Sequence, residues 1–214
     1  PTAITPAAKP PAPAEEPVPS QDYPFPRGLY LRLSDGMLSR RDYRAPVDLL
    51  VDHLSSAGFN LLLLDTFYQG QLIYSGSATG FDSHEAGNEG LKYLIQEAHA
   101  KKIAVHAWLE SALIFGFCEE AQAGGDPGWL PGILGANPSW ALWGKFPGLP
   151  KPVPYRPVEW GGTRYRHYYA DPAVPGVQQK LAELCAEMVT HFEFDGLCLD
   201  RVRYPGATLQ WGNL

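Results

Sequence analysis

The stretch Leu61-Leu62-Leu63-Leu64-Asp65 decides the fold class, because four consecutive apolar residues stop abruptly at a carboxylate. A strand that is apolar at every position is typical of a parallel sheet with both faces covered. The preceding residues predict a helix that ends at Gly58 and carries apolar side chains on one face at Val47, Leu50, Val51 and Leu54. The chain therefore passes from a helix directly into a buried strand.

The same alternation continues on both sides of this unit. Residues 28–33 predict an earlier strand, and residues 103–109 predict a later one that ends at Glu110. The helix between the second and third strands is marked by Leu91, Leu94, Ile95 and Ala98. A last helix over 177–192 precedes the strand 197–199, which ends at Asp200. Four strands alternating with three helices predict parallel β/α units with right-handed crossovers.

Two architectures fit such units, an open doubly wound sheet and a parallel (β/α) barrel of TIM type. Residues 33–36 form no glycine-rich phosphate turn, which an open sheet usually has after its first strand. A barrel has its active site at the C-terminal strand ends. Polar and aromatic residues gather there at Asp35, Asp65, His106, Trp108, Glu110 and Asp200. The α/β barrel is therefore favoured, with about its first four β/α units represented.

The domain organisation follows from length and composition. Residues 1–26 hold nine of the 21 prolines, which predicts an extended, flexible linker. Residues 27–214 are expected to be the N-terminal part of the barrel, since a complete one takes about 250 residues. Within it, residues 111–170 show no clean period and predict a long loop insertion, a kind usually functional. The start at Pro1 indicates either a removed secretory or lipoprotein signal or an arbitrary boundary.

Charge and composition exclude several classes of function. The net charge of -6 provides no basic footprint for nucleic acid or anionic lipid, and favours a neutral or weakly charged substrate. Three widely spaced cysteines form neither a disulfide framework nor a zinc site. We expect no cofactor and no metal, although Asp65, Glu110 and Asp200 leave an enolase-like magnesium site as a minor alternative. No apolar run reaches the roughly 18 residues of a bilayer span.

Four blocks of sequence carry a resemblance to a known family. They are Arg27-Gly28-Leu29-Tyr30, Gly58-Phe59-Asn60, Val105-His106-Ala107-Trp108 and the run FDGLCLDRVRYP at 194–205. In their order and their positions on successive strands, the chain resembles the family 10 glycosyl-hydrolase-like proteins, bacterial barrel enzymes thought to cleave polysaccharides. The sequence departs from the family pattern at three positions. The family commonly has histidine at the position of Cys198, frequently has aspartate at that of Arg201 and often has asparagine at that of Glu110. These departures affect the auxiliary residues more than Asp200.

The resemblance implies a TIM-type barrel, a secreted or cell-envelope location, and a polysaccharide or oligosaccharide substrate, with bacterial cell-wall glycan among the candidates. It also accounts for the linker, because envelope lipoproteins commonly hold their domains away from a membrane tether. The alternative of another class is a noncatalytic glycan-binding or envelope-structural protein on a degenerate barrel.

Glycoside cleavage usually needs two carboxyl groups, one protonated and one ionised. Asp200 is predicted as the nucleophile or base, with Arg201 and Arg203 nearby in sequence to favour its ionised form. Its structural alternative is a carboxylate that pairs with an arginine to tie the loop. Glu110 is the candidate acid, although an exposed loop glutamate is as good an interpretation and the acid in related barrels often lies on a later strand.

Six further residues are predicted to bind substrate: Asp65, His106, Trp108, Arg201, Arg203 and Tyr204. His106 and Trp108 alternate with Ala107, so both should face the same side of the third strand. For His106 a packing role is the more common alternative, and for Asp65 a loop-anchoring role is equally open. Aromatic residues between 129 and 169 are candidates for stacking on sugar rings, with packing within the loop as the alternative.

Overall fold

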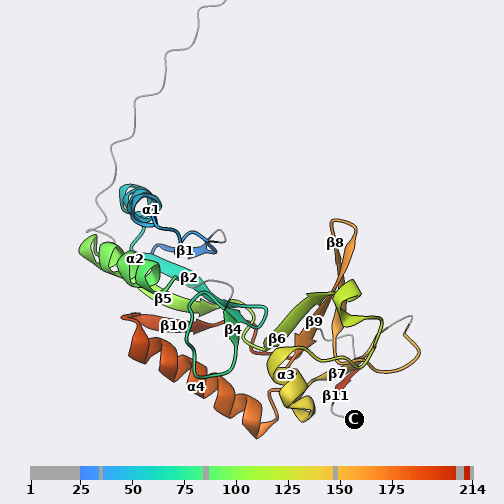
Figure 1. Ribbon diagram of the computed structural model, residues 1–214. Helices are drawn as coiled ribbons and strands as arrows, with labels where there is room; N and C mark the ends of the chain where they lie inside the picture. The colour runs from blue at the N-terminus through green and yellow to red at the C-terminus, as the bar shows by residue number, and fades with distance from the viewer. Residues whose placement is uncertain (1–24, 34–35, 84–86, 147–148, 206–209, 213–214) are drawn as a thin grey trace, which may run out of the picture.

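The computed structural model describes residues 25–33, 36–83, 87–146, 149–205 and 210–212. Its centre is a sheet of four parallel strands in chain order: β1 (Gly28–Leu31), β2 (Leu61–Tyr68), β5 (Ala104–Leu109) and β10 (Gly196–Leu199) (Figure 1). All four predicted strands are confirmed, although β2 continues past Asp65 to Tyr68. The predicted linker lies outside the described residues except for its last two, and so does Asp35.

Three long helices follow the predicted pattern. They are α1 (Arg44–Ser56), α2 (Asn88–Ala100) and α4 (Pro175–His191). The chain leaves α1 through Gly58, whose φ of 74° is a left-handed conformation that favours glycine. None of the helices in the described part of the chain is long and apolar enough to cross a membrane.

The helices pack against one face of the parallel sheet. In β5, Val105, Ala107 and Leu109 are fully buried, whereas His106 and Trp108 between them are only partly buried. Residues paired across a sheet point to the same side, and Leu62 is paired with Val105 as Leu64 is with Ala107. The buried residues of the helices join those of the sheet in one core, whose helical members include Val51, Leu94 and Leu184.

The opposite face of the sheet is open and carries the site. Tyr30 of β1 is 57% exposed there, and His106, Trp108 and Cys198 remain partly accessible. His106 and Trp108 therefore face the same side, as their spacing predicted. Strands in chain order with helices on one face differ from a doubly wound sheet, which has helices on both faces. The described residues form a mixed α/β fold around this partial parallel sheet.

The segment 111–170 corrects the expectation of a long loop. It contains a three-stranded antiparallel sheet of β6 (Ile114–Glu119), β9 (Thr163–Tyr169) and β8 (Arg156–Trp160) (Figure 1). In β8 and β9 aromatic and charged residues are interspersed, so no apolar face stands out in the sequence. The remaining elements are short: η2 (Glu120–Ala123), α3 (Gly132–Ala136), η3 (Pro138–Trp140) and β7 (Trp143–Lys145), which pairs with β11 (Gln210–Gly212).

The antiparallel sheet lies beyond the C-terminal edge of the parallel strands, to the right in Figure 1. Two backbone hydrogen bonds at Asp200 hold the ends of β5 and β10 beside the chain that enters β6. The amide of Asp200 donates to the carbonyl of Leu109 at 3.1 Å, and the amide of Ala112 donates to the carbonyl of Asp200 at 3.3 Å. The short strands β3 (Gln71–Leu72) and β4 (Asp82–Ser83) extend the sheet beside the end of β2.

Gly90→Ala tests how closely α2 packs on the chain after β1. A Cβ at Gly90 would overlap the backbone carbonyl of Leu38. In an exposed helix the same change stabilises by about 0.5 to 1 kcal/mol, but here overpacking should lower the free energy of unfolding by about 1 to 3 kcal/mol. Chemical denaturation measures this, with exposed Gln96→Ala as the control that should stay within about 0.5 kcal/mol. A more stable Gly90→Ala variant would contradict the packing.

Candidate active site

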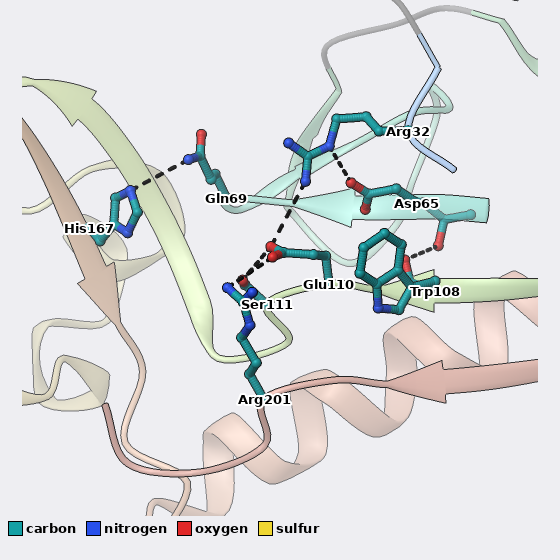
Figure 2. A network of polar contacts seen from close by, with 9 residues as sticks. Arg32, Asp65, Gln69, Trp108, Glu110, Ser111, His167 and Arg201 are labelled. Carbon is teal, nitrogen blue, oxygen red and sulfur yellow. Dashed lines mark hydrogen bonds and ion pairs between the residues drawn. The ribbon is translucent and has the colours of Figure 1, made fainter. Parts of the chain in front are cut away.

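Polar side chains from successive strands meet at the C-terminal edge of the parallel sheet (Figure 2). Asp65 pairs with Trp108 in the register of β2 and β5, so both side chains lie on the open face. Tyr30 packs edge-on against Trp108, with ring centroids 4.7 Å apart. Arg32 follows β1 and reaches across this face toward β2.

Arg32 and Asp65 form the innermost ion pair of the site. The Arg32 Nε donates to Asp65 Oδ2 at 2.6 Å, and its guanidinium lies 3.4 Å from the ring centroid of Tyr68. Asp65 is only 2% exposed, and its Oδ1 is buried without a hydrogen-bond partner in the described part of the chain. Burial raises the pKa of Asp65 to about 6, against the opposing effect of Arg32. This carboxyl thus exchanges its proton near neutral pH.

Glu110 is a buried member of the site, which rules out the interpretation as an exposed loop glutamate. It is 8% exposed, and its Oε1 forms an ion pair with Nη1 of Arg201 at 2.9 Å. The hydroxyl of Ser111 donates to its Oε2 at 2.5 Å, and Arg32 lies 4.0 Å from the same oxygen. Figure 2 shows Glu110 between the two arginines.

Asp200 follows β10 directly and presents an unpaired carboxylate. Its backbone is tied on both sides by the bonds to Leu109 and Ala112, and its side chain is partly buried. Among the described residues, the carboxylate forms no hydrogen bond or ion pair. The predicted support from Arg201 was wrong, because Arg201 adopts a left-handed φ of 54° and pairs with Glu110. Arg203 is exposed and has no ion pair within the described residues.

A cavity of about 310 Å³ lies between the edge of the parallel sheet and the antiparallel sheet. From the first it is lined by Arg32, Glu110 and Arg201, and from the second by Arg156, His167 and Tyr169. Of the predicted site residues, the cavity thus brings together Glu110 and Arg201. The others do not line it: Asp65, His106, Trp108, Asp200, Arg203 and Tyr204. Asp65 contacts it only through Arg32.

His167 and Arg156 belong to the site but were missed in the sequence. Both come from the segment interpreted as a loop, and the alternation of Tyr165, His167 and Tyr169 along β9 was the signal for a strand. Burial lowers the pKa of His167, and the neighbouring charge of Arg156 lowers it further. Its Nε2 lies 3.4 Å from the side-chain nitrogen of Gln69, so a neutral ring can accept that amide hydrogen. The imidazole therefore lines the cavity in its neutral form.

Two predicted binding residues have structural contacts instead. The hydroxyl of Tyr204 donates to Asp171 Oδ1 at 3.0 Å, which ties the chain after β10 to the entry of α4. The ring of His106 lies against Gly196, where any Cβ would come within 2.9 Å of it. Trp108 keeps a buried indole N–H with no acceptor among the described residues. The described ranges contain no group of three His, Cys, Asp or Glu side chains arranged to hold a metal ion.

Comparison with known proteins identifies distant relatives. No protein-family model matches the chain. Glycosyl hydrolase DigH of Escherichia coli strain K12 is 24% identical over 181 residues, which cover 80% of this chain and 37% of that protein. The Shigella flexneri protein of the same name matches equally. The chain is weakly homologous to a glycosyl hydrolase. It spans 37% of the length of these curated relatives.

Solved structures show a similar fold. A cycloisomaltooligosaccharide glucanotransferase of Paenibacillus sp. matches with a TM-score of 0.53 at 15% identity, over 86% of this chain and 25% of that one. A hypothetical protein from Ruminiclostridium thermocellum also matches with a TM-score of 0.53, at 18% identity, over 83% of this chain and 78% of that one. The mixed α/β fold of the chain is thus similar to part of each of these two structures.

The raised pKa of Asp65 predicts a pH dependence of stability. Because its pKa is about 6 in the folded protein and 3.8 ordinarily, the folded state binds more protons between these values. The free energy of unfolding should therefore fall as pH rises, by about 2 kcal/mol from pH 4 to 7 relative to Asp65→Asn. Denaturation across this range measures the difference.

The control is Asp42→Asn, whose exposed carboxyl has a pKa lowered by Arg40. The free energy of unfolding of the wild type, relative to that of Asp42→Asn, should therefore rise with pH instead of falling. If the difference between wild type and Asp65→Asn stays constant with pH, the account of Asp65 is wrong.

Proposed function

We propose that the chain is the N-terminal part of a (β/α) barrel glycoside hydrolase that cleaves a polysaccharide, bacterial cell-wall glycan among the candidates. The barrel is supported by four parallel strands in chain order with their helices on one face. A sheet of this kind closes into a barrel when further β/α units continue it. The homology to a glycosyl hydrolase and the resemblance of the run at 194–205 support the activity. A polysaccharide substrate also favours a secreted or envelope location.

The observation that carries this proposal is the position of two carboxylates after neighbouring parallel strands. Glu110 follows β5 and Asp200 follows β10, and the backbone bond from Asp200 to Leu109 holds the two strand ends together. Glycoside hydrolysis commonly uses two carboxyl groups on either side of the scissile bond. One of this pair is buried and hydrogen-bonded, and the other has no partner within the described residues.

We assign the unpaired Asp200 as the nucleophile or general base. It is partly accessible, it lies where parallel barrels have their catalytic residues, and no arginine occupies its oxygens. Glu110 is the second carboxyl, and before it can donate a proton to a leaving oxygen its bond to Arg201 has to break. The same ion pair favours the alternative of a noncatalytic glycan-binding protein. A carboxylate that is paired with an arginine can help to position a bound sugar, but it is not free to transfer a proton.

The antiparallel sheet provides an aromatic surface for sugar rings next to the cavity. Phe117 and Tyr165 stack with ring centroids 5.0 Å apart, and Trp160 at the β8–β9 turn is 77% exposed. Phe117 is paired with His167 and Tyr165 with Val158, both of which line the cavity. Aromatic faces suit the apolar side of pyranose rings. This surface is therefore a candidate path for a glycan into the cavity.

Asp200→Asn in the full-length protein should abolish cleavage while leaving folding intact. The change removes the charge with little change of shape, so turnover should fall by at least about a thousandfold, or about 4 kcal/mol of transition-state stabilisation. Because the carboxylate has no partner in the described residues, the melting temperature should change little. Release of reducing ends from purified bacterial glycan strands measures turnover, alongside a thermal melt.

Asp195→Asn is the matched control for this experiment. Asp195 accepts hydrogen bonds from the amide of Val105 and from His99, so the control should lower the melting temperature and spare turnover per folded molecule. Retention by Asp200→Asn of more than about a tenth of wild-type turnover would end the assignment. Wild-type protein that binds the strands without cleaving them would favour the noncatalytic alternative.

Trp160→Ala tests the aromatic surface. Loss of one stacked ring should raise KM for long glycan strands several-fold, since aromatic contacts contribute about 0.5 to 1.5 kcal/mol, and leave kcat nearly unchanged. Leu49→Ala, at an exposed apolar residue of α1, is the control that should change neither constant. Equal kinetics of Trp160→Ala and wild type on long strands would exclude Trp160 from the path.

A further inference from the structure

The cavity is more basic than the protein as a whole. The net charge of the chain is -6, yet three arginines line this one space: Arg32, Arg156 and Arg201. They come from three separate parts of the fold, after β1, in β8 and after β10. Glu110 is the single carboxylate among the described residues that line it. Side chains so far apart in sequence share a cavity wall only because the antiparallel sheet faces the edge of the parallel sheet.

Two of these three arginines form ion pairs with carboxylates, and the third does not within the described residues. Arg32 is paired with Asp65 at 2.6 Å, and Arg201 with Glu110 at 2.9 Å. Arg156 forms no ion pair within the described residues, and its side chain interacts instead with the hydroxyl of Tyr169. Three guanidinium groups thus face two carboxylates, and one of these, Asp65, lies behind Arg32 rather than in the wall.

The pKa of His167, which lines the cavity, is lowered. Burial is the main cause of its lowered pKa, and the charge of Arg156 lowers the pKa further. Glu110 opposes this with a smaller effect than that of Arg156, and Arg201 adds the smallest lowering effect. Its ring is bonded to Gln69 in a way that suits the neutral form. The imidazole therefore adds a polar surface but no negative charge to balance Arg156.

We propose that this cavity binds a carboxylate substituent on a sugar of the glycan, held by Arg156 together with Arg201. The planar guanidinium fork matches a carboxylate in two parallel hydrogen bonds, which gives both orientation and affinity. A volume of about 310 Å³ is at the lower end of ligand pockets, so it suits one substituted sugar rather than a long segment. A neutral sugar would offer the exposed guanidinium of Arg156 no such charged pair.

This inference rests on the proposed glycan substrate and narrows it to acid-bearing glycans. It differs from the expectation of a neutral or weakly charged substrate, which followed from net charge alone. Asp200 and the aromatic surface are not altered by it. The acidic group would bind beside Glu110, where it competes for Arg201 and so frees the Glu110 carboxyl on binding.

The test uses acid-bearing bacterial glycan strands and the same strands with their carboxyl groups converted to neutral amides. In the full-length protein, Arg156→Gln should weaken binding of the untreated strands about tenfold or more, the usual effect of losing a charged hydrogen bond. It should leave the already weaker binding of the amidated strands unchanged. Arg156→Lys should restore part of the loss because it keeps the charge. Titration calorimetry measures each affinity.

Arg164→Gln is the matched control, since Arg164 is an exposed arginine of β9 whose side chain alternates to the opposite face from His167. It should bind both kinds of strand as the wild type does. Equal binding of treated and untreated strands by wild type, or equal loss in Arg156→Gln and Arg164→Gln, would overturn the inference. Neither result depends on cleavage, so failure here is distinct from retained turnover in Asp200→Asn, which would overturn the proposed function.

Discussion

The two backbone hydrogen bonds at Asp200 are the constraint on which the site depends. They join Asp200, which directly follows β10, to Leu109 at the end of β5 and to Ala112 at the entry to the antiparallel sheet. Backbone donors and acceptors buried in this region have to be paired, and this is how the chain pairs them. The left-handed conformation of Arg201 follows immediately and directs its side chain to Glu110. A strained non-glycine residue beside a tied strand end is common at functional sites.

From that constraint the charges of the site follow in sequence. Arg201 is engaged by Glu110 and Arg32 by Asp65, so Asp200 is left open on one side and Arg156 on the other. Burial opposes ionisation of Asp65 strongly enough to raise its pKa to about 6 despite Arg32. The fold thus separates its carboxylates by environment, one buried behind an arginine, one bonded in the cavity wall and one unpaired. Such separation is what acid and base chemistry in one site requires.

The sequence predicted what depends on local spacing. The parallel strands and their helices have clean apolar periods, and the open face of β5 followed from the alternation of His106 and Trp108. The position of Asp200 at a strand end followed from where the apolar residues of β10 stop. The end of β2 was misplaced because Phe67 and Tyr68 continue the strand after the charged Asp65.

What depends on tertiary contacts was beyond the sequence. Arg201 reaches Glu110 with a left-handed backbone conformation, which the sequence does not predict. Glu110 is buried, although the residues next to it in the sequence do not predict its burial. His167 and Arg156 belong to the site only because β8 and β9 fold over its edge. Interpreting 111–170 as a loop removed half of the cavity wall from view. The net charge likewise described the surface as a whole and missed the local balance at the cavity.

The central claim is that a glycan binds where the two sheets meet, with Asp200 at the bond to be cleaved. A crystal structure of the full-length Asp200→Asn protein with a bound oligosaccharide of the substrate tests it directly. We expect a sugar ring in the cavity beside Arg201 and His167, with a glycosidic bond next to the side chain of residue 200. A sugar bound elsewhere, with the cavity empty and residue 200 remote from any glycosidic bond, would contradict it.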